Sequence, residues 1–270
     1  MKKKIGFIGS GKMAQAMMNG IIQSKLVNPE DIIASAKTEE TLDYVKRNFE
    51  VNVTLDNNVV AQEADYLFLA VKPYYYSTVI EEIREYISEH TVVITIAAGV
   101  TIQSIEESFR RDVKVVRSMP NTPSLVGEGM TAYCINHHLS EEEAKYVHEI
   151  FASFGSVELV NESLMDAVPA ISGSSPAYVY MFIEALADGG VKQGFTRKQA
   201  YTFAAQAVLG AAKMVLETGT HPAELKDNVC TPGGTTIAAV AELERNHFRA
   251  AILEAMESCT KKSVELANKK

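Results

Sequence analysis

The chain has 270 residues and a formal net charge of −8, and 47% of its residues are hydrophobic. This length allows one large domain or two ordinary ones. The acidic balance argues against a nucleic-acid partner or an anionic membrane surface, so we expect neither. Its cysteines, Cys134, Cys230 and Cys259, form no metal-binding or disulfide pattern. We therefore expect no metal site and a reducing, cytoplasmic location.

The first 160 residues alternate short apolar runs with helical patterns. Nearly continuous apolar strands separated by helices are typical of a parallel sheet that is covered on both faces. The predicted strands are residues 4–9, 31–35, 65–71, 91–99 and 112–120, with additional strands at 129–136 and 155–160. The predicted helices between them are residues 11–25, 39–49, 74–88, 101–110 and 141–153.

The last part of the chain has a different pattern. No convincing strand follows residue 162, and residues 176–193, 197–218, 234–245 and 247–268 are predicted to be helices. We therefore predict an α/β domain at residues 1–160 and an all-α domain at residues 161–270.

Two of these late helices are too apolar for isolated surface helices. Residues 177–191 and 201–216 carry alanine, glycine and large apolar residues on most faces. A helix that is apolar all round must be buried, and a domain of about 110 residues cannot bury every such face alone. We predict a homo-oligomer whose subunits interlock through this half. The alternative is that the helices pack on the α/β domain.

The stretch GFIGSGKM, residues 6–13, can be interpreted in two ways. A phosphate loop would need a full strand before Gly6 and a hydroxyl residue in place of Met13. A dinucleotide-binding turn needs Gly9 for the tight turn, Gly11 for close approach of a pyrophosphate, and the small Ala14 for helix packing. The second interpretation fits, so we predict a Rossmann-like dinucleotide-binding domain. Its first cofactor-binding residues are Gly9, Ser10, Gly11, Lys12 and Met13.

The end of the second predicted strand bears on the choice of dinucleotide. NAD needs a carboxylate there for its ribose diol, but the chain has Ser35, Ala36 and Lys37. A hydroxyl and a cation suit a 2′-phosphate, so we expect NADP(H) to be preferred and NAD(H) to be possible. Glu39 or Glu40 could swing back to the ribose, although both are better placed to start the next helix.

Three more segments end strands of the predicted sheet. Ligands of open α/β sheets bind beyond the carboxyl ends of the strands, so three such segments at one edge predict a cleft. The residues that we assign to the cofactor from these segments are Ala70, Val71, Lys72, Pro73, Ala97 and Asn121.

The helical half contains the sequence TPGGTTIAA, residues 231–239. A Gly-Gly-Thr-Thr helix start offers backbone amides and hydroxyl groups, which together can bind a carboxylate. Helix capping alone does not need both glycines, so we favour a ligand-binding role.

Seven stretches occur in order along essentially the whole chain, and together they resemble pyrroline-5-carboxylate reductases. They are GFIGSGKMAQAM, AVKP, AAGVT, SMPNTP, SGSSPAY, HPAELKDNVCTPGGTT and FRAAILEAM. The resemblance implies NAD(P)H-dependent reduction of the imine of 1-pyrroline-5-carboxylate to L-proline, the final step of proline biosynthesis. It also implies a dinucleotide-binding domain followed by a helical dimerisation domain. The dimer would be intertwined, with a higher ring as a further possibility.

The resemblance also implies roles for individual residues. Asn57 matches a cofactor-contacting asparagine, and Glu162 stands where the family has an acidic residue near the site. Thr236 would hydrogen-bond the ring nitrogen of the substrate, with either Thr236 or water delivering the proton. We assign Thr236 and Lys72 to catalysis. The residues assigned to the substrate are Glu162, Asn228, Thr231, Gly233, Gly234, Thr235 and Thr236.

Two other functions are compatible with a two-domain dinucleotide-binding chain. A hydroxy-acid dehydrogenase needs a general base, which Lys192, Lys213 or Lys226 would have to supply. A non-catalytic redox sensor would bind NADP(H) without turnover. The Pro-Gly-Gly-Thr-Thr element argues against the sensor, because a sensor has no use for a second receptor that faces the nicotinamide.

Overall fold

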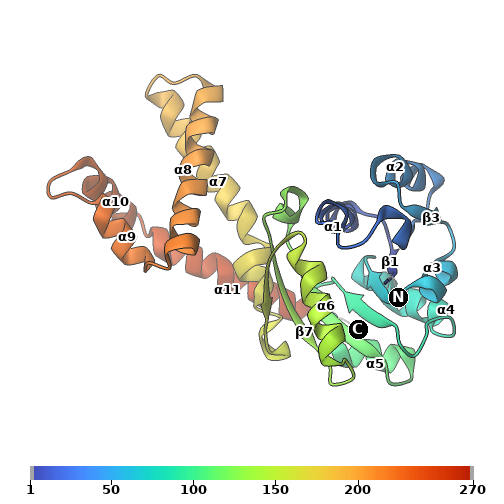
Figure 1. Cartoon of the computed structure of the whole chain (residues 1–270). Helices are drawn as coiled ribbons and strands as arrows, with labels where there is room; N and C mark the ends of the chain where they lie inside the picture. Colours follow the sequence, from blue (N-terminus) through green and yellow to red (C-terminus); the bar gives the residue numbers. More distant parts are fainter. Residues whose placement is uncertain (1–2, 268–270) are drawn as a thin grey trace. The chain divides into compact units, whose positions relative to one another are not determined.

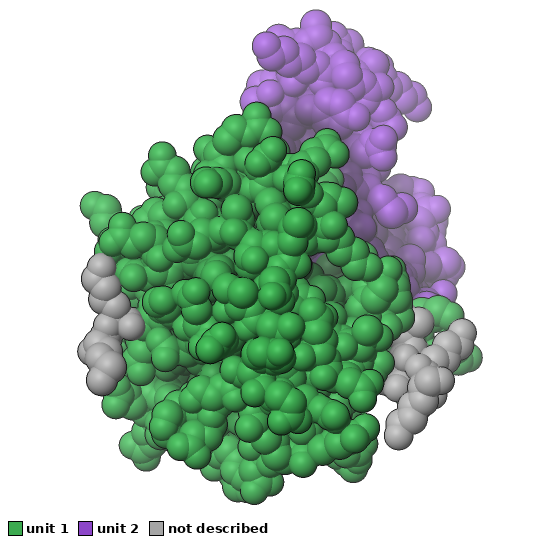
Figure 2. Space-filling view, turned by 90° about the vertical axis from the view of Figure 1, so that its right-hand side faces the viewer, with its two compact units in different colours: residues 1–174, 259–270 green, residues 175–258 purple. Residues whose placement is uncertain are grey.

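The computed structural model describes residues 3–267 and divides into two compact units (Figure 2). The first unit comprises Met1–Ser174 and Cys259–Lys270, and the second comprises Ser175–Ser258. The division falls after Ser174, whereas the sequence placed it after residue 160. The reason is that two short helical segments, η4 (Glu162–Leu164) and η5 (Pro169–Gly173), belong to the first unit.

The first unit is built on one eight-stranded sheet (Figure 1). Its spatial order is β3-β2-β1-β4-β5-β6-β7-β8, with β1 to β6 parallel and β7 antiparallel to β6. The chain builds outward on one side of β1 and then returns to build on the other side, so the order reverses between β1 and β4. The strands are β1 (Ile5–Ile8), β2 (Ile32–Ser35), β3 (Asn52–Thr54), β4 (Tyr66–Leu69), β5 (Val92–Thr95), β6 (Lys114–Met119), β7 (Gly129–Ile135) and β8 (Gly155–Leu159).

Helices cover both faces of this sheet and form a separate hydrophobic core with each face. One core contains side chains of α1 (Lys12–Gln23), α2 (Glu39–Phe49) and α6 (Glu141–Ala152). The other contains side chains of α3 (Asn57–Glu63), α4 (Tyr76–Ile83) and α5 (Ile102–Phe109). Every residue of β1, β2, β4 and β5 is buried, which explains their nearly continuous apolar sequences. The predicted α/β class is confirmed.

Three elements of the fold were not predicted: β3, α3 and α9 (Pro222–Val229). Strand β3 is a three-residue edge strand without a fully buried residue, so it lacks the apolar run that marks the other strands. The predicted helix 74–88 is shorter in the structure, where α4 begins at Tyr76 and ends at Ile83. At its start, Pro73 opens a 3-10 turn, η2 (Pro73–Tyr75), before α4 begins. Two further 3-10 turns are η1 (Pro29–Asp31) and η3 (Thr122–Val126).

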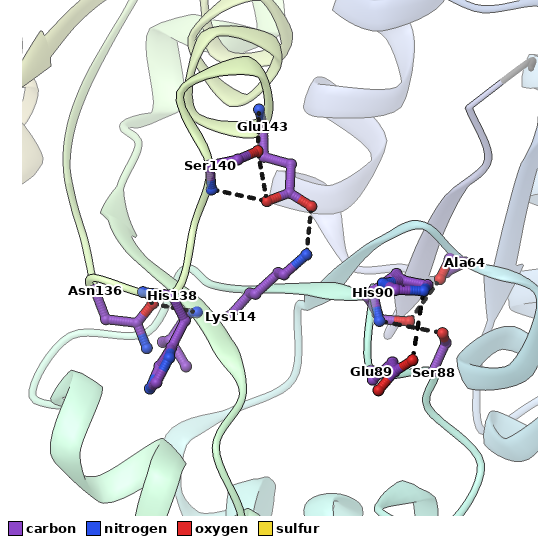
Figure 3. Close-up of polar contacts among 11 residues, drawn as sticks. Ala64, Ser88, Glu89, His90, Lys114, Asn136, His138, Ser140 and Glu143 are labelled. Atoms are coloured by element: carbon purple, nitrogen blue, oxygen red, sulfur yellow. Dashed lines mark hydrogen bonds and ion pairs between the residues drawn. The ribbon is translucent and has the colours of Figure 1, made fainter.

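Helix α6 starts with a capping box between Ser140 and Glu143. The Glu143 carboxylate also accepts a hydrogen bond from the Lys114 ammonium group (Figure 3). The distance between the two atoms is 2.6 Å. Burial opposes ionisation of this carboxyl, but hydrogen bonds from Lys114 and Ser140 outweigh burial and lower the pKa of Glu143 below its usual 4.5. The contact therefore ties β6 to the helix that covers it.

The second unit consists of α7 (Ser175–Lys192), α8 (Arg197–Thr218), α9, α10 (Thr235–Arg245) and the first part of α11 (Phe248–Ala267). Helices α7 and α8 pack side by side (Figure 1). Of the apolar side chains in residues 175–258, all described, the buried ones are only Ala187, Ala200 and Ala204. No helix within residues 3–267 is long and apolar enough to cross a membrane.

Candidate functional site

A cavity of about 980 Å³ opens in the first unit where the strand order reverses. This is the place at which open α/β sheets bind their ligands. Most of the residues that the sequence assigned to the cofactor line it: Gly9, Ser10, Gly11, Lys12, Met13, Ala36, Lys37, Ala70, Val71, Lys72, Pro73, Ala97 and Asn121.

The side chains that line the cavity carry an excess of positive charge. Among the described residues, Lys12, Lys37 and Lys72 line the cavity, and no aspartate or glutamate does. The chain as a whole carries a net charge of −8, so this local excess of cations stands out. A positive cavity suits a ligand with several phosphates.

The turn after β1 is held at the bottom of the cavity by close backbone contacts. Gly9 has φ +98°, and a Cβ at this position would lie 2.7 Å from the carbonyl oxygen of Ala70. The Gly9 amide and the Ser10 hydroxyl both donate to the carbonyl of Ser35, at 3.2 and 2.8 Å. Only glycine fits at residue 9, because both the backbone conformation and the space exclude a side chain.

Gly11 has a different reason to be glycine. It is the N-cap residue of α1 in an extended conformation, and a Cβ there would meet nothing within 4 Å. Among the described residues, no side chain accepts a hydrogen bond from the first turn of α1. The positive end of this helix therefore opens onto the cavity, and the absent side chain leaves room for a phosphate group. The turn fits the pyrophosphate of a dinucleotide.

The segment after β2 supplies Ala36, Lys37, Thr38 and Thr41 to the lining. Lys37 lies with its Nζ 3.6 Å from the centroid of the Tyr75 ring, which comes from η2. Glu39 and Glu40 form the first turn of α2 and are outside the lining, as the sequence indicated. At this part of the cavity, the lining residues that the structure describes thus offer a cation and no carboxylate.

Ser35 and Asn57 do not line the cavity. Ser35 is fully buried, and its hydroxyl donates to Oδ1 of Asn57 at 2.7 Å. Asn57 in turn donates from Nδ2 to the carboxylate of Glu82, at 3.0 Å. The Ser35 hydroxyl is thus already hydrogen-bonded inside the protein. Ser35 and Asn57 therefore stabilise the end of β2 without lining the cavity.

The lining residues that follow β4, β5 and β6 form what we call the far wall of the cavity. This wall depends on a buried network that the sequence did not indicate. The Tyr76 hydroxyl donates to the carbonyl of Leu69 at 2.5 Å and accepts from the Thr95 hydroxyl at 2.8 Å. Burial raises the pKa of the Tyr76 phenol well above its usual value, which keeps it neutral. Tyr76 therefore joins the ends of β4 and β5. In the sequence, the run of three tyrosines after Pro73 was the feature that could have indicated this network.

Asn121 lines the same wall, but its amide group is already engaged. Its Oδ1 accepts from the Met130 amide at 2.8 Å, and its Nδ2 donates to the Ser172 carbonyl at 2.9 Å. It therefore fixes the loop after β6 to residues 172–173.

Glu162 lies outside the large cavity. Its carboxylate accepts from the Ile102 amide at 2.8 Å and from Arg117 at 3.3 Å. Asp166 accepts from the same buried guanidinium at 2.6 Å. Glu162 borders a separate cavity of about 530 Å³ next to β7 and β8. A buried arginine needs such partners, which explains an acidic residue at this position without a ligand.

The turn at residues 231–236 lies in the second unit. Gly233 has φ +68°, and a Cβ on Gly234 would collide with the Thr231 hydroxyl. Gly233 is thus required by its backbone conformation and Gly234 by the space that the Thr231 side chain takes. A ligand-binding role for this turn stays a prediction. Thr235 and Thr236 open α10, and among the described residues no capping side chain accepts a hydrogen bond from the amides of its first turn. Asn228 is exposed on α9, shortly before this turn.

The lysines that a dehydrogenase would need as a base all lie on helices of the second unit. Lys192 ends α7 and Lys213 lies within α8, while Lys226 forms an ion pair with Asp227 at 3.0 Å. Within residues 3–267, no group of three His, Cys, Asp or Glu side chains is placed to hold a metal ion.

Comparison with known proteins extends over the whole chain. Residues 162–266 match the family model "Pyrroline-5-carboxylate reductase dimerisation", and residues 4–99 match "NADP oxidoreductase coenzyme F420-dependent". The pyrroline-5-carboxylate reductase of Escherichia coli is 47% identical over 99% of both chains.

Solved structures agree with this relationship. A pyrroline-5-carboxylate reductase from Coxiella burnetii superimposes with a TM-score of 0.92, at 35% identity, over 98% of this chain and 99% of the other. The Plasmodium falciparum pyrroline carboxylate reductase, solved with NADP bound, gives a TM-score of 0.89 at 35% identity over 98% of each chain. The resemblance found in the sequence is confirmed, and the chain belongs to the pyrroline-5-carboxylate reductase family.

Proposed function

We propose that the chain binds a reduced nicotinamide dinucleotide in the 980 Å³ cavity of its first unit and reduces 1-pyrroline-5-carboxylate to L-proline. This is NAD(P)H-dependent reduction of an imine, the final step of proline biosynthesis. Beside the family relationship, one observation carries the proposal. The cavity lies at the reversal of strand order, the described residues that line it include three lysines and no carboxylate, and the uncapped start of α1 opens onto it.

NADPH is the preferred cofactor, and NADH is the weaker alternative. Lys37 supplies a cation for the 2′-phosphate, and Thr38 and Thr41 supply hydroxyl groups beside it. A relative from Plasmodium falciparum was solved with NADP bound, which supports the same choice.

The chain's own residues hold and orient the cofactor. Gly9 allows the tight turn and Gly11 leaves the backbone open to the pyrophosphate, while Lys12 and Lys72 balance its charge. Ser35 and Asn57 keep the end of β2 in place. Glu162 stabilises Arg117 on β6, the strand that ends at the far wall. When bound, the reduced nicotinamide supplies the hydride.

The turn at residues 231–236 receives the substrate. Backbone amides in the first turn of α10 bind its carboxylate, with Asn228 and Thr231 at the edge of the same turn. Thr236 donates its hydroxyl to the ring nitrogen and orients the imine carbon towards the hydride donor. The carbon gains the hydride, the electron pair of the C=N bond moves to nitrogen, and nitrogen takes up a proton. Since an alcohol is a weak acid, water delivers this proton.

The second unit forms the interface of a dimer. The family model that it matches is a dimerisation model, and its large apolar side chains are exposed in the single chain. Interlocked dimers assemble further into a ring, which the family resemblance supports. A cytoplasmic location is in keeping with the three free cysteines.

The direct test follows NADPH oxidation by absorbance after addition of 1-pyrroline-5-carboxylate. We expect Thr236→Ala to lower kcat/KM by about 100-fold through loss of an interaction that orients the imine, with the Kd for NADPH within about twofold of the native value. Thr220→Ala, at another half-buried threonine of the second unit, is the matched control and should keep full activity. Equal losses in turnover and NADPH affinity would place Thr236 on the cofactor instead.

A further inference from the structure

Lys37 and Tyr75 come from two separate segments and meet at the wall of the cavity. Lys37 lies two residues after the end of β2, and Tyr75 ends the 3-10 turn that follows β4. The Lys37 ammonium nitrogen lies 3.6 Å from the centroid of the phenol ring, and both side chains line the cavity. An ammonium group over an aromatic face is attracted by the negative face of the ring.

The contact restrains a side chain that would otherwise be mobile. A lysine has four methylene groups and loses rotamer entropy when a ligand orders it. Lys37 is exposed to solvent apart from this contact with Tyr75.

We propose that Tyr75 is a positioning residue that determines the preference for NADPH over NADH. Its ring holds the Lys37 ammonium group at the cavity wall, so the 2′-phosphate of NADPH meets a cation that is already in place. The N–H groups that point away from the ring remain free to bind the phosphate. This inference rests on the proposed function, in which Lys37 receives that phosphate.

Two other roles for Tyr75 make different predictions. If its ring stacks on the adenine, its loss weakens NADPH and NADH equally, because both contain adenine. If the contact with Lys37 is only a surface contact, its loss changes neither affinity. Discrimination between the two cofactors is therefore the quantity to measure.

The experiment measures the Kd of NADPH and of NADH for the full-length protein by nicotinamide fluorescence, which no tryptophan of this chain can disturb. The variants are Tyr75→Leu, Tyr75→Phe, Lys37→Met and the double variant Tyr75→Leu/Lys37→Met. The matched control is Tyr74→Leu, since the Tyr74 ring is 4.5 Å from that of Tyr75, is 72% exposed and is not part of the lining.

We expect Tyr75→Leu to raise the Kd for NADPH about fivefold, as for an exposed cation–π contact, and to leave the Kd for NADH within twofold. Tyr75→Phe keeps the ring and should match the native protein, as should Tyr74→Leu. In the Lys37→Met background, Tyr75→Leu should have no further effect, because the two residues act through one interaction.

An equal loss for both cofactors, no loss for either, or an undiminished loss in the Lys37→Met background would each overturn the proposal. The assignment of Lys37 is tested separately: if Lys37→Met leaves the NADPH-to-NADH ratio unchanged, the 2′-phosphate site itself is wrong. Turnover of 1-pyrroline-5-carboxylate with NADH tests the reductase activity independently of both.

Discussion

In the first unit, β1, β2, β4 and β5 are buried at every position, whereas in the second unit the buried apolar residues are three alanines. The first unit therefore closes two hydrophobic cores within one chain. Helices α7, α8, α10 and α11 leave large apolar side chains in solvent, among them Met181, Phe203 and Leu216, with exposures of 69%, 65% and 79%. Exposed apolar surface of this extent marks an interface between proteins.

The difference shows that the two units depend on association to different degrees. A segment of 84 residues without its own core cannot offset the entropy that its folding loses, unless another surface covers it. The first unit needs no such cover to build its cavity. The following experiments test this contrast, beginning with the largest expected effect.

A charge placed on the apolar surface of the second unit should separate the subunits. We expect Phe203→Glu to convert the dimer to a monomer and to lower turnover more than about 100-fold, because a buried unpaired charge destabilises an interface strongly. Light scattering after size-exclusion chromatography gives the mass. Tyr44→Glu, on α2 of the first unit and 48% exposed, is the control and should remain a dimer.

NADPH binding by the same variant tests the independence of the first unit. Its Kd should stay within about threefold of the native value, because every residue of the cavity lining belongs to that unit. If Phe203→Glu remained a dimer, the contrast in how far the two units depend on association would be wrong. It would also be wrong if the first unit stayed folded but no longer bound NADPH.

Substitution of two glycines in the same turn, Gly9 and Gly11, should distinguish a structural role from a ligand-binding role. Gly9→Ala should lower the free energy of unfolding by about 2 kcal/mol and abolish NADPH binding, because the backbone is left-handed and the space is filled by Ala70. Gly11→Ala should change the free energy of unfolding by less than about 1 kcal/mol, yet raise the Kd for NADPH at least about tenfold. Urea unfolding and NADPH titration measure the two effects. Unchanged binding by Gly11→Ala would remove the pyrophosphate from this turn.

The smallest expected effect concerns the contact between β6 and α6 (Figure 3). The pKa of Glu143 is lowered in the folded protein, so its contribution to stability is present above pH 4.5 and is lost as the pH falls through the folded pKa. Glu143→Gln should lower the free energy of unfolding by about 1 kcal/mol at pH 7, and this difference should shrink below pH 4.5. Urea unfolding at several pH values tests this, with the exposed Glu142→Gln as control. A difference that is independent of pH would show that Glu143 does not act through its charge.

Much of the first unit could be predicted because its signals are local. The turn after β1 and the alternation of apolar strands with helices depend on neighbouring residues and fixed spacings. The lining residues after β1, β2, β4 and β5 followed from one rule, that the ends of parallel strands meet at one edge of the sheet.

The sequence could not indicate contacts between residues that are far apart along the chain. Ser35 has a hydroxyl at the expected place, but the hydroxyl points to Asn57 on α3, an element too short to stand out in the sequence. Glu162 is engaged with Arg117, 45 residues earlier. Tyr76 and Tyr75 take their roles from Thr95 and Lys37, partners that no local pattern reveals.

The sequence by itself determined the α/β class, the dinucleotide-binding turn, the helical character of the C-terminal half and the family. Each of these depends on residue type and spacing along the chain. Only the tertiary structure decided which polar groups are free for a ligand and which are already paired, because a hydrogen bond depends on distances in space. It also separated Gly9, which the backbone requires, from Gly11, which leaves open space in the cavity.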